Sequence, residues 1–202
     1  MKARINISRT ARQGFTLIEL LAVMAIFVTL AAVITPAITS AVRSSRINMA
    51  TQFVIDEINA ARAAAIAQNK PMEFCFLRGA TGTAGLFEQM AVRSVEQDGT
   101  KQWIHKSRKL PDGVTISANG ALSTVIGSQT EQTNPRGEKE VCLLFTPSGE
   151  MSLTALTGAK PTEYYLTLAS ASDLLKTPDA FPANFATIRI DPRNSQTTLH
   201  RP

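Results

Sequence analysis

The hydrophobic pattern of the chain changes near residue 15 and again near residue 43. From Phe15 to Val42 the only charged side chain is Glu19, and residues 20–42 form 23 consecutive uncharged positions. A helix over these positions, at about 1.5 Å per residue, would be roughly 35 Å long, which exceeds a bilayer core of about 30 Å. The pattern therefore predicts a transmembrane helix over residues 15–42. A buried helix of a soluble protein is the alternative, which this length and purity disfavour.

A second apolar periodicity begins after Arg43. Apolar residues recur every three or four positions, which is typical of one face of an α-helix. This face consists of Ile47, Ala50, Val54, Ile58, Ala61 and Ala65. We therefore predict one helix over residues 16–68, with its first half in lipid and its second half packed on a globular domain.

Prolines set the expected shape and end of this helix. Pro36 removes a backbone hydrogen bond, but the helical pattern on both sides of it indicates a bend and not an end. Asn69-Lys70-Pro71 should stop the helix at about residue 69. A secretory signal, with small residues at 37–41 as its cleavage site, is an alternative that remains open. The apolar stretch is long for such a signal, and the helical pattern continues beyond it.

After Pro71 the pattern changes to short β-like runs separated by turn residues. The better strand candidates are residues 72–77, 91–96, 101–106, 141–146, 163–168 and 187–191. Three segments rich in small and polar residues are predicted to be loops, at residues 79–85, 117–140 and 169–186. A helix followed by a run of strands favours an α+β fold with an antiparallel sheet.

The net charge of +5 belongs mainly to the first 14 residues. They contain four basic side chains and no acid, so the rest of the chain has 21 − 4 = 17 basic against 16 acidic side chains. Basic residues concentrated before an apolar run favour a cytoplasmic N-terminus, with the C-terminal bulk of the chain exported.

Candidate catalytic and redox chemistry is sparse. The histidines, His105 and His200, are far apart in sequence, and no Walker-type glycine loop, HExxH or EF-hand pattern occurs. We therefore predict a protein that is not an enzyme and that holds no cofactor. Apolar residues flank both Cys75 and Cys142, which favours buried free thiols. An oxidising periplasm would permit a disulfide if their two strands are adjacent.

The segment Gly14-Phe15-Thr16-Leu17-Ile18-Glu19, between a basic leader and the apolar run, closely resembles the start of type IV pilins and type II secretion pseudopilins. The resemblance implies that a prepilin peptidase cuts between Gly14 and Phe15 and methylates the new N-terminus. Residues 60–76 look most like minor pseudopilins of the H and FimT kind. The tail from Ile190 to Pro202 is more distantly similar to pilin-like proteins of the Verrucomicrobia.

Glu19 gains a role from this resemblance. Cleavage would create a cationic amine at Phe15, about one helical turn away, and in the family the carboxylate pairs with the amine of a neighbouring subunit. An unpaired charge at the bilayer centre costs about 2.5–3.5 kcal/mol, so pairing can select the register between subunits. Glu19 is therefore the candidate assembly residue. A carboxylate that reaches the headgroups without a partner is the alternative.

The predicted organisation has three parts: a cleaved leader at 1–14, a transmembrane helix at 15–42, and a periplasmic domain at 43–202. The domain is helical to about residue 69 and then mainly β. The resemblance implies a minor pilin or pseudopilin that is assembled into a type IV pilus-like filament or a type II secretion pseudopilus. Its expected partners are the prepilin peptidase, other pilins or pseudopilins, and the inner membrane.

Two other functions remain open from the sequence: a membrane-anchored minor pilin that binds DNA for uptake, and a plain anchored domain with no assembly role. The DNA alternative depends on Arg189, Arg193 and Arg201 in the tail. Three phosphate contacts would give only weak affinity, so DNA is not an expected partner. Major pseudopilins often bind calcium near their C-termini. The acids of this region, Asp173, Asp179 and Asp191, are scattered, and no metal is expected.

Overall fold

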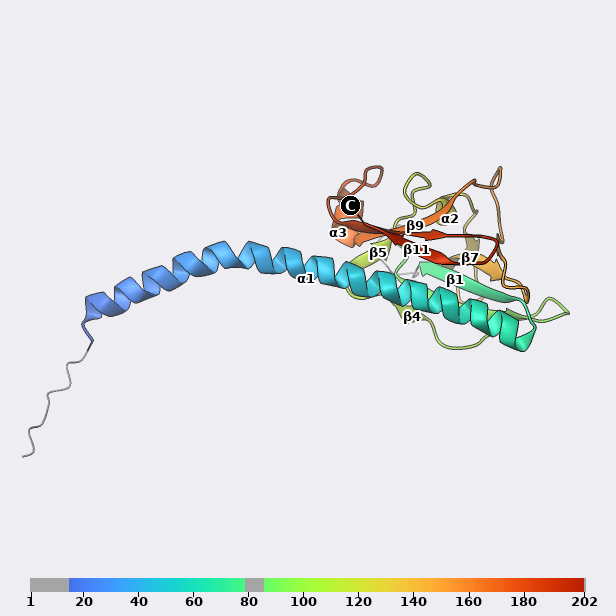
Figure 1. Cartoon of the computed structure of the whole chain (residues 1–202), viewed down its shortest axis with the longest axis horizontal. Helices are drawn as coiled ribbons and strands as arrows, with labels where there is room; N and C mark the ends of the chain where they lie inside the picture. The colour runs from blue at the N-terminus through green and yellow to red at the C-terminus, as the bar shows by residue number, and fades with distance from the viewer. Residues whose placement is uncertain (1–14, 79–85, 202) are drawn as a thin grey trace, which may run out of the picture. The chain divides into compact units, whose positions relative to one another are not determined.

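The computed structural model describes residues 15–78 and 86–201. In these ranges a long helix, α1 (Leu17–Gln68), precedes a domain of strands and short helices (Figure 1). The predicted α+β class is confirmed. The chain divides into two compact units, with the boundary between Val42 and Arg43. The predicted leader, with Gly14, and the predicted loop at 79–85 lie outside the described residues.

The helix α1 is continuous through Pro36, so this proline does not end it. The predicted bend at Pro36 stays a prediction. The helix ends as the sequence indicated: Asn69 adopts a positive φ of 50°, and the Lys70 N–H donates to the Ala65 carbonyl at 3.2 Å. With the 3.3 Å bond from the Asn69 N–H to the Ile66 carbonyl, this is a Schellman motif, which satisfies carbonyls left free at a helix end. Pro71 then prevents continuation.

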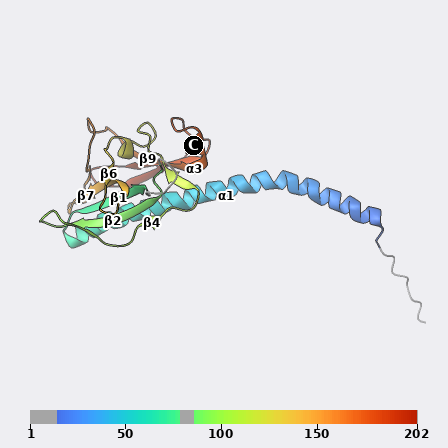
Figure 2. The same ribbon diagram turned by 180° about the vertical axis from the view of Figure 1, so that it is seen from behind.

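The larger sheet has seven strands, and all of its pairings are antiparallel. The strand order is β3 (Lys101–Trp103), β2 (Gln89–Val95), β1 (Met72–Arg78), β7 (Lys139–Phe145) and β6 (Gln132–Thr133). The short strand β4 (Arg108–Lys109) also pairs with β2, and β8 (Met151–Leu153) pairs with β7. Figure 2 shows β2, β1, β7 and β6 together on one side of the domain.

The smaller sheet has four antiparallel strands, in the order β11 (Thr197–His200), β10 (Phe185–Ile190), β9 (Tyr164–Ser170) and β5 (Val114–Ile116). In β10, Ile188 and Ile190 are buried whereas Arg189 between them is exposed, which confirms the predicted alternation of this strand.

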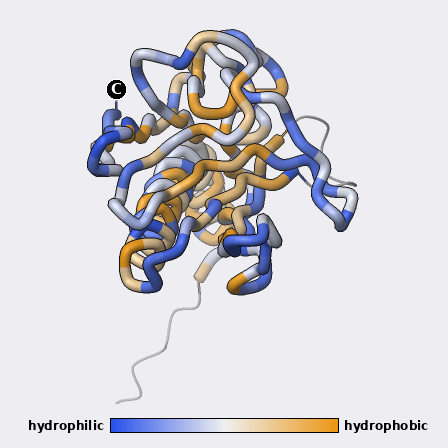
Figure 3. The backbone as a smooth tube through the Cα atoms, turned by 90° about the vertical axis from the view of Figure 1, so that its right-hand side faces the viewer, coloured by the Kyte–Doolittle hydropathy of each residue, from blue (hydrophilic) through white to orange (hydrophobic). Residues whose placement is uncertain are grey.

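One hydrophobic core joins the second half of α1 to both sheets. The apolar helix face predicted from the sequence packs in this core. Each of its residues is at most 1% exposed: Ile47, Ala50, Val54, Ile58, Ala61 and Ala65. The larger sheet contributes Phe74 and Phe76, and the smaller sheet contributes Leu166 and Leu168. In Figure 3 hydrophobic residues gather on the central strands and hydrophilic residues on the surrounding loops.

Two of the predicted loops contain regular structure, so that part of the prediction is wrong. The segment 117–140 holds the one-turn helix α2 (Thr124–Gly127) and β6, and the segment 169–186 holds α3 (Ala171–Lys176) and the start of β10. These elements are too short to show a period in the sequence, and tertiary contacts stabilise them. One example is the Thr167 N–H, which donates to the Ser123 hydroxyl beside α2 at 2.9 Å.

Candidate functional site

The first turn of α1 is closed by a reciprocal pair of hydrogen bonds between Thr16 and Glu19. The Thr16 N–H and hydroxyl each donate to Glu19 Oε2 at 2.9 Å, and the Glu19 N–H donates to Thr16 Oγ1 at 3.3 Å. This is a capping box, in which two backbone donors that a helix start leaves free are satisfied by side chains. The Thr-x-x-Glu spacing that marks such a box is present in the sequence, whereas the role predicted for Glu19 was ion pairing alone.

The capping box gives Glu19 a second role next to the expected one. In the isolated chain its carboxylate holds the helix start, and Phe15, the residue predicted to carry the new amine, is adjacent to the capping residue Thr16. A glutamine at position 19 would preserve the cap, because capping boxes accept Glu or Gln, but it would remove the charge. Cap and charge can therefore be separated by substitution.

The apolar stretch of α1 is open to the surroundings within its own unit. Between Phe15 and Leu30 the large apolar side chains range from 46% exposed at Val23 to 86% exposed at Phe15. No other described part of the first unit covers them.

Among the residues that the structure describes, no helix is both long and apolar enough to cross a membrane.

Cys75 and Cys142 form a disulfide. The prediction of buried free thiols, which the sequence favoured, is therefore wrong. The physical reason is strand pairing: β1 and β7 are neighbours, and their register places the two cysteines directly opposite each other. Their Cα atoms are 4.0 Å apart. Residues that face each other in an antiparallel pair point to the same side of the sheet, which brings the two sulfur atoms together.

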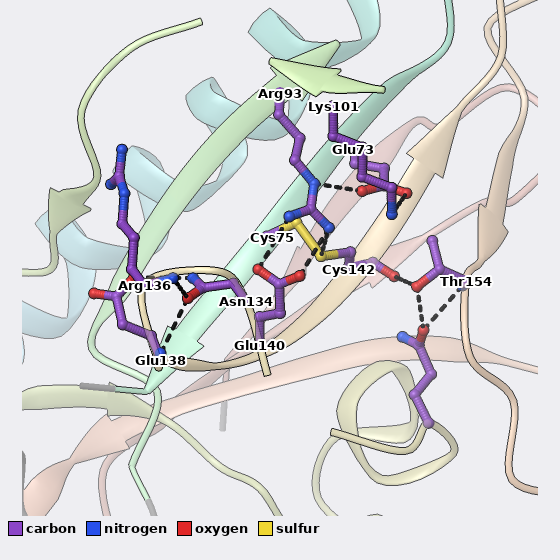
Figure 4. A network of polar contacts seen from close by, with 11 residues as sticks. Glu73, Cys75, Arg93, Lys101, Asn134, Arg136, Glu138, Glu140, Cys142 and Thr154 are labelled. Atoms are coloured by element: carbon purple, nitrogen blue, oxygen red, sulfur yellow. Dashed lines mark hydrogen bonds and ion pairs between the residues drawn. A yellow bond between two sulfur atoms is a disulfide. The ribbon is translucent and has the colours of Figure 1, made fainter. Parts of the chain in front are cut away.

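A buried ion-pair cluster surrounds this disulfide on the face of the larger sheet that points away from α1 (Figure 4). Arg93 lies at its centre: its Nε donates to Glu73 Oε2 at 2.5 Å, and its Nη2 donates to Glu140 Oε1 at 2.8 Å. A second bond, from Nη1 to Glu140 Oε2 at 3.3 Å, makes the contact with Glu140 bidentate. The three residues are at most 5% exposed. Lys101, 2.8 Å from Glu73, balances the second carboxylate, so the cluster is neutral.

Trp103 covers this cluster between two guanidinium groups. Its ring centre is 4.9 Å from Arg93 Cζ and 5.3 Å from Arg136 Cζ. Asn134 fixes the turn that carries Arg136, because its side-chain oxygen accepts the backbone N–H groups of Arg136 and Glu138 at 2.9 and 3.0 Å. Cation–π contacts of this kind stabilise by about 0.5–2 kcal/mol, more when they are shielded from water.

The cluster brings three possible metal ligands close together, but its chemistry does not suit a metal. One ligand atom from each of Glu73, Cys75 and Cys142 lies within 4.8 Å of the others. The sulfur atoms are bonded to each other, and the Glu73 carboxylate is bound by Arg93 and Lys101. This arrangement is an ion-pair cluster that supports the sheet.

The scattered acids of the C-terminal region are each engaged locally. Asp173 pairs with Arg43 at 3.3 Å, Asp179 accepts a bond from the Asn119 amide at 2.6 Å, and Asp191 accepts the Arg193 N–H at 2.9 Å.

Only one of the two histidines, His200, lies in a strand. His105 follows β3 and is 3.8 Å from Glu57 of α1, which also pairs with Arg108. His200 ends β11 in the smaller sheet.

Two of the three tail arginines, Arg189 and Arg193, have acidic neighbours. Arg189 points to solvent as predicted and pairs with Glu163 at 3.2 Å. Arg193 and Arg189 line one hollow together with Glu163 and Asp191, so the surface has mixed charge. Phosphate binding depends on unbalanced positive charge, and this hollow offers little.

Comparison with known proteins gives two matches to described families. A prokaryotic N-terminal methylation motif matches residues 9–35. The family described as type II transport protein GspH matches residues 50–177, more than half of the chain. No curated protein matches the sequence.

Two solved structures, both of the minor pseudopilin EpsH from the type 2 secretion system of Vibrio cholerae, are similar to this chain. The first has 12% sequence identity and a TM-score of 0.45, and the match covers 78% of this chain and 98% of that one. The second has 13% identity and a TM-score of 0.46, with 80% and 96% covered.

Proposed function

Because this chain belongs to the family of the type II transport protein GspH, we propose that it is a minor pseudopilin, a structural subunit of a type II secretion pseudopilus. The observation that carries the proposal is the succession of two matches in one chain: the N-terminal methylation motif at 9–35 and the GspH family at 50–177. A methylation motif implies processing by a prepilin peptidase and assembly with other pseudopilins.

The proposed processing site is the Gly14–Phe15 bond. Cleavage there would leave Phe15 as the mature first residue, directly before Thr16 of the capping box. We propose that residues 15–42 then anchor the subunit in the inner membrane, with the second unit in the periplasm. Support comes from the 23 uncharged positions at 20–42 and from the basic residues before them.

We expect the mature protein, extracted from membranes, to lack residues 1–14 and to carry one methyl group on Phe15. Intact-mass analysis and N-terminal fragment spectra measure both. Gly14→Leu should leave the leader attached, because the residue at the cleavage site must be small, whereas Gln13→Leu should be processed normally. A mature chain that begins at Met1, or after Ala41, would contradict the proposal.

Glu19 is the proposed assembly residue, and two substitutions separate its possible roles. Glu19→Gln keeps the capping box but removes the charge, and Glu19→Ala removes both. If pairing with a neighbouring amine is the function, incorporation into the pseudopilus should fall sharply, and equally, in both variants. Membrane insertion should be unchanged or improved, since a charge that costs about 2.5–3.5 kcal/mol in lipid has been removed.

Site-specific crosslinking to other pseudopilins measures incorporation, and flotation with membranes measures insertion. Normal crosslinking of Glu19→Gln together with weak crosslinking of Glu19→Ala would assign Glu19 to the helix cap alone. Normal crosslinking of both variants would exclude Glu19 from assembly.

A further inference from the structure

Two large apolar side chains, one in α3 and one in the segment after it, are exposed on the second unit. Leu175 is 48% exposed and Phe181 is 55% exposed, although both are large apolar residues. The Phe181 ring packs on that of Phe185, with ring centres 4.9 Å apart, so Phe181 is held in place at the surface. We call Leu175, Phe181 and Phe185 the α3 patch. Apolar side chains that are held at the surface offer a contact for an apolar partner or for lipid.

The α3 patch lies beside the first residue of the second unit. Arg43 begins that unit, and its Nη1 is 3.3 Å from Asp173 Oδ2 in α3. The strand register agrees, because β9 ends and β10 begins at this end of the smaller sheet, with Ala169 opposite Phe185. Arg43 is also the first charged residue after the uncharged run at 20–42. The patch therefore lies near the residue at which the second unit begins.

Cationic side chains accompany the α3 patch. Arg43, Arg46 and Lys176 are exposed, and so is Arg201, which follows the last residue of β11. The strand register places His200, the residue before Arg201, opposite Thr187 near the start of β10. The acids of this end are engaged: Asp173 pairs with Arg43, Asp179 accepts a bond from Asn119, and Asp112 pairs with Lys109. With Lys109 included, these five cations outnumber the three acids by 5 − 3 = 2 charges.

We propose that the α3 patch docks on the headgroup layer of an anionic membrane, with Leu175 and Phe181 inserted among the lipids and Lys176 and Arg46 on their phosphates. Apolar side chains flanked by Lys and Arg bind the interface in this way, and each cation near an anionic surface contributes about 1 kcal/mol. The inference rests on the proposed anchoring by residues 15–42, because that anchor brings this end of the unit to the bilayer surface.

Docking would hold the unassembled subunit against the membrane in a preferred orientation. Entry into a filament would require release of the patch from lipid. The α3 patch would then be available to contact other subunits.

A nitroxide at position 175 tests the proposal in the full chain. Native Cys75 and Cys142 are buried and bonded, so the label attaches only to the introduced cysteine of Leu175→Cys. Ile66→Cys is the matched control, because Ile66 is 47% exposed and lies 23 residues further along α1 than Arg43, or about 35 Å. Both are reconstituted in vesicles containing phosphatidylglycerol, and collision with oxygen and with a nickel chelate is measured.

The expected result is that the label at 175 collides mainly with oxygen and excludes the nickel chelate, whereas the label at 66 behaves as an aqueous site. Lys176→Gln, in the Leu175→Cys background, should lower the ratio of docked to undocked protein about fivefold. Vesicles of phosphatidylcholine alone should lower it further.

Three other outcomes overturn the proposal in distinguishable ways. A chain that floats with vesicles but has an aqueous label at 175 overturns the lipid contact and leaves the anchor intact. A label shielded from both reagents, increasingly so at high protein-to-lipid ratio, means that a second copy covers the patch. A chain that does not float at all overturns the anchor and, with it, the docking.

Discussion

Replacing Arg93 with alanine should lower the free energy of unfolding by about 3–5 kcal/mol, the typical cost of removing one partner from a buried ion pair. Glu73 and Glu140 are each at most 5% exposed, and Arg93 bonds both. Without it, Glu140 would lose its ion-pair partner inside the protein, and Glu73 would retain only Lys101. Burial of an unbalanced carboxylate is costly, because the interior solvates charge far less well than water does.

Urea unfolding of the purified full chain, followed by the fluorescence of Trp103, measures this loss. Trp103 is the single tryptophan of the chain, and it lies 4.9 Å from the Arg93 guanidinium. Arg189→Ala is the matched control: that arginine also pairs with a glutamate, but both side chains are 56% exposed. Exposed pairs contribute about 0–1 kcal/mol, so the control should differ little from the natural protein.

A rescue variant separates charge imbalance from lost packing. Adding Glu140→Gln to Arg93→Ala removes the carboxylate that the arginine balanced, and we expect part of the lost stability to return. Packing alone would explain the loss if the double variant were no more stable than Arg93→Ala. A loss from Arg93→Ala no larger than that of the control would contradict a structural role for the cluster.

Removing the disulfide should be the second large effect. Cys75→Ala with Cys142→Ala should lower the free energy of unfolding by about 2–5 kcal/mol, because the bond restricts the unfolded chain over a sequence separation of 67 residues. The fold itself should persist, since β1 and β7 remain paired along seven residues from Met72 to Arg78. A dithiol reductant should destabilise the natural protein and leave the double variant unchanged.

Mass spectrometry after alkylation provides the decisive control for this prediction. Protein unfolded in iodoacetamide without reductant should gain no label, and reduction should permit two labels. Labelling of both cysteines without reductant would show free thiols, the state that the sequence favoured. Equal unfolding free energies of oxidised and reduced protein would contradict the stabilising role.

The helix and the N-terminal motif were readable from the sequence because their signals are local. The spacing of Ile47 to Ala65 fixes one face of α1 through the period of 3.6 residues, and Asn69-Lys70-Pro71 fixes its end. The capping box of Thr16 and Glu19 is equally local, although the sequence prediction for Glu19 did not include it. All six expected strands overlap strands of the structure, since each is a short β-like run between turn residues.

Only the tertiary structure decided the disulfide and the cluster around Arg93. Glu73, Cys75 and Leu77 occupy alternate positions of β1, and a charged residue in such a series predicts a face that is open to solvent. The structure buries this face because Trp103 of β3 and Arg136, in the turn after β6, fold over it. Both covering residues are distant from β1 in the chain, so no local pattern could reveal that Glu73 meets Arg93 or that Cys75 meets Cys142. These residues meet because the strand register, which depends on the energy of the whole sheet, places them opposite each other.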